Sequence, residues 1–145
     1  MEAASKQLLV AAAEGDLAAV EAALLAGANI EAAEEFGDTA LNRAAANGHG
    51  DVVVRLIAAG ANLENLGGAD MTPLMNAATA SHLPSVRALI AAGAKVTDDL
   101  LGSVSTKVSI LEENAEIGMV RPEAVGAWRG FLNELLAARA AQDRD

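Results

Sequence analysis

The sequence predicts an all-α solenoid in which short helix pairs stack in a row, and three observations support this. Of the 145 residues, 52% are hydrophobic but only 2% are aromatic, so small aliphatic side chains dominate and favour close helix–helix packing. Residue patterns recur every 33 positions. Glycines follow the apolar stretches, where helices commonly end. Together these features indicate a repeat protein.

The period is clearest at positions where a small residue or a branched side chain returns in the same phase. It relates Gly27-Ala28 to Gly60-Ala61 and Gly93-Ala94, Gly15 to Gly48 and Ser81, and Val20 to Val53 and Val86. So many matches at one spacing indicate three copies of one structural unit.

The second copy predicts two short helices. Thr39 is expected to cap the first helix with its hydroxyl, and Gly48 to end it. A second helix is expected from about Asp51 to Ala59, before Gly60. The next ten residues, 61–70, are too many for a tight turn, so we expect a projecting hairpin loop there.

These motifs resemble the ankyrin-repeat family over Ser5 to about Val96. The matching motifs of the second copy are Thr39-Ala40-Leu41, Ala44-Ala45, Gly48-His49, Val52-Val53 and Gly60-Ala61. Asn42 and Met75 stand where the family has a histidine, and we expect these changes to weaken a local hydrogen-bond network. Asp70 stands where glycine is usual, and an aspartate tolerates the positive φ of such a turn.

The period breaks after Val96. We therefore predict one ankyrin-repeat domain over 1–145, made of an N-terminal capping repeat 1–33, repeats 34–66 and 67–96, a degenerate helix pair 97–120 and a capping helix 121–140. Pro122 fits the first position of that last helix. Trp128 and Phe131 are expected either to form a capping core over the open end of the solenoid or to line an exposed docking face.

Charge and composition exclude several classes of function. The net charge is −10, and residues 1–38 hold eight acidic side chains against Lys6 alone, so binding to nucleic acid or an anionic membrane is not expected. The absence of cysteine excludes disulfides and thiol chemistry. The sequence shows no signal peptide or membrane-spanning stretch, so we expect a cytoplasmic protein.

We expect no enzyme activity, no catalytic or metal-binding residue and no cofactor. His49 and His82 occupy the same repeat position, and stacked repeats would hold them about 10 Å apart, too far to share a zinc ion. Adjacent carboxylates such as Glu34 and Glu35 do not face one another, as acid–base catalysis requires. No nucleophile is paired with a base.

The resemblance implies that hairpin loops and exposed positions of the first helices meet the partner. By position, these are Glu14, Ala33, Glu35, Phe36, Asp38, Ala46, Asn47, Leu66, Ala69, Met71, Thr79 and Ala80. Phe36, Leu66 and Met71 are apolar residues at positions expected to be exposed, which is typical of contact surfaces. The alternative for Phe36 is that it folds back onto its own hairpin.

The resulting expectation is a monomeric protein-interaction module, an adaptor or scaffold that holds another protein of basic or mixed charge. One alternative is an inhibitory or immunity-type protein that blocks a specific enzyme or toxin. Another is a self-associating structural protein, a homodimer formed through the C-terminal helix with Trp128 at the seam.

Overall fold

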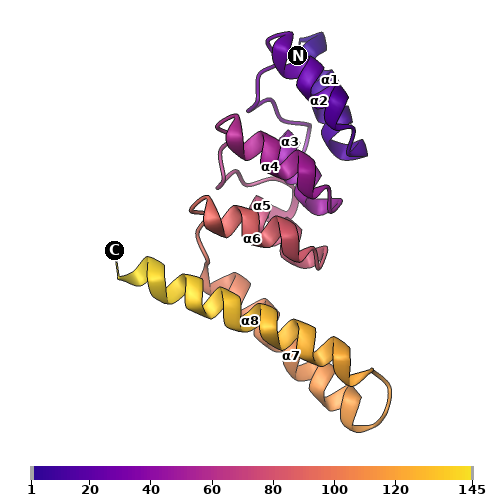
Figure 1. Ribbon diagram of the computed structural model, residues 1–145, viewed down its shortest axis with the longest axis vertical. Coiled ribbons are helices and arrows are strands. Elements are labelled where there is room, and N and C mark those ends of the chain that lie inside the picture. The colour runs from indigo at the N-terminus through magenta and orange to yellow at the C-terminus, as the bar shows by residue number, and fades with distance from the viewer. Residues whose placement is uncertain (1, 145) are drawn as a thin grey trace. The chain divides into compact units, whose positions relative to one another are not determined.

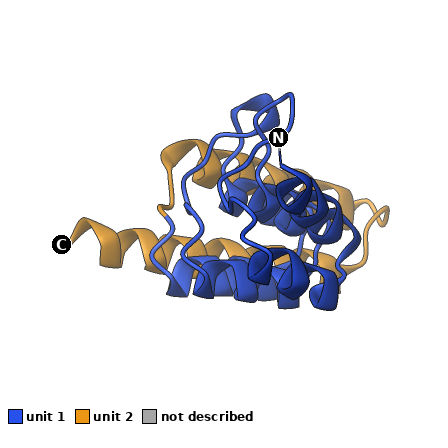
Figure 2. Cartoon of the chain, turned by 90° about the horizontal axis from the view of Figure 1, so that it is seen from above, with its two compact units in different colours: residues 1–94 blue, residues 95–145 orange. Residues whose placement is uncertain are grey.

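The computed structural model describes residues 2–144, which form helices joined by loops (Figure 1). The chain divides into two compact units, residues 1–94 (unit 1) and 95–145 (unit 2), coloured separately in Figure 2. Met1 and Asp145, the two ends of the predicted domain, lie outside the described residues. A single domain over 1–145 stays a prediction.

Unit 1 consists of three helix pairs stacked in chain order (Figure 1). The pairs are α1 (Ala3–Glu14) with α2 (Leu17–Leu25), α3 (Ala40–Ala46) with α4 (Gly50–Ala58), and α5 (Pro73–Thr79) with α6 (Leu83–Ala91). The first helices contact one another in the order α1, α3, α5, and the second helices in the order α2, α4, α6. The predicted all-α repeat solenoid is confirmed.

The core of unit 1 repeats with the sequence. Val20, Val53 and Val86, one from each copy, are all 0% exposed, and Thr39 caps α3 as predicted. Helices of seven to nine residues are marginal in water on their own. Burial of these side chains against neighbouring pairs therefore supplies most of the stability of each helix.

The turns between paired helices are aligned along the stack. Gly15, Gly48 and Ser81 all adopt a left-handed backbone, with φ of 75°, 71° and 58°. A Cβ atom added to Gly15 would lie 2.5 Å from Nδ1 of His49, and one added to Gly48 would lie 3.3 Å from Cδ2 of His82. The turns at Gly15 and Gly48 thus each lie against the histidine of the next copy, which fits stacking at a period of 33.

Unit 2 is formed by two long helices that pack on each other, α7 (Asp98–Glu116) and α8 (Pro122–Asp143). The predicted helix pair in 97–120 is wrong, because a single helix spans this segment. Serine and threonine residues lie inside this helix without interrupting it. The Thr106 and Ser109 hydroxyls donate to the carbonyls of Gly102 and Ser105, at 2.9 and 3.2 Å, within the same helix.

Helix α8 begins at Pro122, as predicted, and continues to Asp143, beyond the expected end at residue 140. Phe131 is buried, in agreement with a core role, and the Trp128 ring packs edge-to-face on it at 5.6 Å between centroids. Nζ of Lys107 lies 4.2 Å from the centre of the Trp128 ring. The capping of the solenoid by this helix stays a prediction.

Candidate functional site

Two hairpin loops of the same construction join the helix pairs of unit 1. In the first, N–H of Glu34 donates to the carbonyl of Asp38 at 2.9 Å. In the second, N–H of Gly67 donates to the carbonyl of Met71 at 3.0 Å, so the pairing recurs with the period of 33. Asp70 has a φ of 56°, which confirms that an aspartate occupies the turn where glycine is usual. We call residues 33–38 and 66–71 the hairpin face.

Hydrogen bonds fix the two hairpins to each other. The Asp38 carboxylate accepts from N–H of Gly68 at 3.0 Å, and Nδ2 of Asn65 donates to the carbonyl of Gly37 at 2.9 Å. The hairpin face is therefore a connected surface and not two independent loops.

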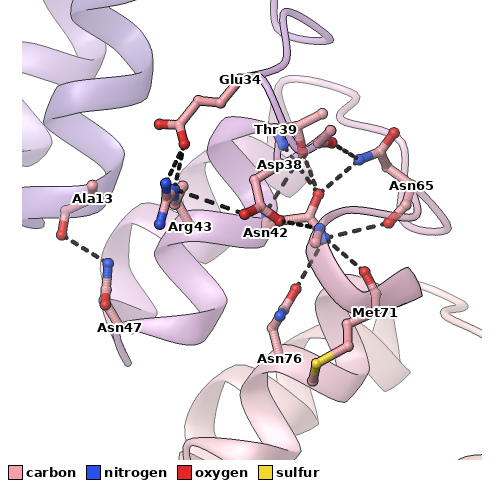
Figure 3. Close-up of polar contacts among 12 residues, drawn as sticks. Ala13, Glu34, Asp38, Thr39, Asn42, Arg43, Asn47, Asn65, Met71 and Asn76 are labelled. Carbon is pink, nitrogen blue, oxygen red and sulfur yellow. Dashed lines mark hydrogen bonds and ion pairs between the residues drawn. The ribbon is translucent and has the colours of Figure 1, made fainter.

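A buried asparagine, Asn42, supports the hairpin face through hydrogen bonds (Figure 3). Asn42 is 1% exposed. Its Oδ1 accepts hydrogen bonds from Nδ2 of Asn65 at 2.8 Å and from N–H of Thr39 at 3.2 Å. Its Nδ2 donates to the carbonyl of Met71 at 3.2 Å and to Oδ1 of Asn76 at 2.9 Å. The expectation that Asn42 weakens the local network is wrong, because an amide both donates and accepts and so joins two helices and a hairpin.

The cation closest to this face, Arg43, is already neutralised. Its guanidinium forms an ion pair with Glu34, with Nε 2.9 Å from Oε2, and lies 4.0 Å from Asp38 (Figure 3). The hydrogen bond from Arg43 to Glu34 raises the pKa of Arg43, so the guanidinium keeps its positive charge. Glu35 and Asp70 are exposed and form no ion pair within residues 2–144, which leaves the face acidic.

Apolar side chains lie beside these carboxylates. Phe36 is 75% exposed and Leu66 is 58% exposed, one on each hairpin. The alternative that Phe36 folds back onto its own hairpin is wrong, since such packing would bury most of its ring. Two exposed apolar groups on a hydrogen-bonded frame form a surface suited to contact with another molecule.

Ten of the twelve predicted contact residues are exposed, and Asp38 and Met71 are half-buried. Seven of them belong to the hairpin face: Ala33, Glu35, Phe36, Asp38, Leu66, Ala69 and Met71. Four lie at the ends of α3 and α5: Ala46, Asn47, Thr79 and Ala80. Nδ2 of Asn47 also donates to the carbonyl of Ala13 at 3.1 Å, so this residue helps to join the first two pairs. Glu14 lines a separate groove between α1 and α2.

Sequence reasoning missed the supporting residues Asn65, Asn76 and Arg43. Asn65 and Asn76 have no counterpart at the period of 33, so the repeat gave no signal for them. The opposite charges of Glu34 and Arg43 on either side of a predicted turn were the only available indication of their ion pair.

The histidines have structural partners. Nε2 of His49 lies 3.0 Å from the carbonyl oxygen of Ala13, and Nδ1 of His82 accepts from N–H of Ser85 at 3.3 Å, which caps α6. Within residues 2–144, no group of three or more His, Asp or Glu side chains is placed to hold a metal ion. In the same part of the chain, no helix is long and apolar enough to cross a membrane.

Comparison with protein families matches residues 8–99 to a model for ankyrin repeats in three copies. The matched segment contains the three stacked helix pairs and both hairpins, and reaches the start of α7. No curated protein matches the chain.

Proposed function

Because the chain belongs to the ankyrin-repeat family, we propose that it binds another protein through its hairpin face and serves as an adaptor or scaffold. Ankyrin repeats are generally protein–protein interaction modules and are typically not enzymes. The observation that carries the proposal is the pair of exposed side chains, Phe36 and Leu66, on neighbouring hairpins. Aromatic residues such as Phe36 are enriched in protein interfaces relative to the rest of the surface.

Charge indicates the partner class. The hairpin face and Arg43 together hold four carboxylates (Glu34, Glu35, Asp38 and Asp70) against one guanidinium, a net charge of 1 − 4 = −3. A partner with lysine or arginine around an apolar side chain complements this surface and is steered toward it.

The buried amide network supports the same function by limiting the cost of binding. A loop that orders only on contact loses conformational freedom and therefore affinity. Asn42 and Asn65 hold both hairpins in place without a partner. The face is thus pre-organised for docking.

The proposal is tested by capture of partners from the cell that makes the protein, with the full chain as bait. The double variant E35K/F36A reverses one exposed charge and removes the exposed ring, and we expect it to reduce capture of the main partner at least about tenfold. The matched control, E116K/I117A, makes the same change at an exposed acid–apolar pair in unit 2 and should leave capture unchanged. Circular dichroism checks that both variants stay folded.

Equal capture by the wild type and E35K/F36A would contradict the hairpin face as the binding surface. Loss of capture by E116K/I117A alone would move the surface to unit 2. An inhibitory or immunity-type role remains the alternative to a scaffold, and activity of the captured protein with and without this chain separates the two.

A further inference from the structure

The first helix pair has an apolar groove on its outer side. The groove is lined by Lys6, Val10, Glu14, Ala19 and Ala22, among others, and Val10 is 55% exposed. In repeat proteins, apolar faces are normally covered by the neighbouring unit, and exposed outer faces are polar. Here valine and alanine occupy the middle of that face, so apolar surface is left open to solvent.

Two opposite charges flank the apolar centre of the groove. Lys6 precedes Val10 by four residues and Glu14 follows it by four, which places all three on one side of α1. Both charged side chains are exposed, and neither forms an ion pair within residues 2–144. Lys6 is the one cation among eight acidic side chains in residues 1–38.

This pattern is complementary to an inverted copy of itself. In a twofold interface, residue i of one subunit meets residue j of the other, and j meets i in return. With Val10 near the axis, Lys6 of each copy comes to the level of Glu14 in the other copy. Each of the two contacts pairs one positive with one negative charge, whereas the hairpin face is acidic and has no such balance.

Neighbouring acidic side chains on α2 do not oppose such a contact. Glu21 is held in an ion pair by Arg55, and the carboxylate of Asp16 accepts from N–H of Ala19 at 3.0 Å as the cap of α2. The groove itself therefore has one positive and one negative group around an apolar centre.

We propose that this groove binds a second copy of the chain, with α1 packed antiparallel against α1 of the partner and Val10 beside the twofold axis. The surface of one helix pair is smaller than a standard interface, so the dimer is weak, with a Kd on the order of 100 µM. This inference does not rest on the proposed function, because the hairpin face contributes no residue to the groove.

Sedimentation equilibrium of the full 145-residue chain tests the proposal from about 5 to 500 µM. The wild type should pass from monomer to dimer over this range. V10D places two carboxylates next to the axis and should weaken association at least about tenfold. Because Val10 is exposed, the variant should fold, which circular dichroism verifies.

A charge exchange identifies the occupant of the groove. K6E or E14K alone should weaken the dimer severalfold, since each replaces two attractive contacts by repulsive ones. The combined variant K6E/E14K should restore it, because the exchanged charges meet again across the axis. L136D, at an exposed position of α8, is the control and should leave the dimer unchanged.

A wild-type chain that is still monomeric at about 500 µM would overturn the proposal. So would a dimer that is unaffected by V10D but lost in L136D, which would place self-association on the C-terminal helix. Failure of K6E/E14K to restore association would also reject the reciprocal pairing.

Discussion

Gly15 in unit 1 and Gly130 in unit 2 have contrasting surroundings. Gly15 ends a helix with a φ of 75°, and a Cβ atom there would lie only 2.5 Å from Nδ1 of His49. Gly130 lies inside α8, and nothing lies within 4 Å of the place a Cβ atom would occupy. The same residue type is thus required by the backbone in one unit and is a cost to helix stability in the other.

The contrast extends to how each unit is built. The α3 and α5 helices of unit 1 have seven residues each and depend on turns, caps and a buried amide network. In unit 2, α7 has 19 residues and α8 has 22, and each helix is continuous over its length. Unit 1 should therefore be sensitive to single substitutions at its polar joints, whereas unit 2 should tolerate them.

The largest expected effect is at the buried amide. N42L removes the hydrogen bonds of Asn42 and leaves Asn65, Asn76 and the carbonyl of Met71 without that partner, which should lower the free energy of unfolding by about 3 kcal/mol. The matched variant in unit 2, N114L, removes no side-chain hydrogen bond within residues 2–144 and should change stability by less than about 0.5 kcal/mol. Urea unfolding followed by far-UV circular dichroism measures both. Equal destabilisation by N42L and N114L would contradict the expected difference between the two units.

The next effect concerns the glycines themselves. G15A forces alanine into a left-handed backbone and against the His49 ring, at a cost of about 2 kcal/mol. G130A places alanine in an open helix position and should raise stability by about 1 kcal/mol. The same urea titration compares them, and destabilisation by G130A would indicate that this face of α8 is covered.

The smallest effect sharpens the comparison within unit 1. Ser81 adopts a φ of 58° at the position that glycine fills in the first two copies. S81G removes that strain and should raise the melting temperature, with a gain of about 0.5 to 1 kcal/mol. An unchanged or lower melting temperature would mean that the serine side chain compensates for the strain.

The parts of the structure that were predictable are those set by neighbours in sequence. Thr39 caps α3, Pro122 begins α8, and the stacked pairs follow the period of 33. The division of 97–120 into two helices failed because it extended the repeat beyond Val96, where the period breaks. The Thr106 and Ser109 hydroxyls instead bond within one continuous helix.

The support of the candidate site could not be predicted in the same way. Asn42 contacts Asn65 and Asn76, which are 23 and 34 residues further along the chain. Such contacts exist only once the pairs have stacked, and the repeat contains no equivalent in the other copies. The exposed hairpin residues could be predicted from their position in the repeat, whereas the hydrogen-bonded residues that support them could be identified only in the folded structure.

The single tryptophan has a practical consequence. Trp128 lies in unit 2 beside Phe131, under the ammonium group of Lys107, and the chain contains no tyrosine. Its fluorescence is therefore an intrinsic reporter of unit 2 alone, while unit 1 is spectroscopically silent in that channel. Recording emission alongside dichroism during one titration would show directly whether the two halves of the chain melt together or in sequence.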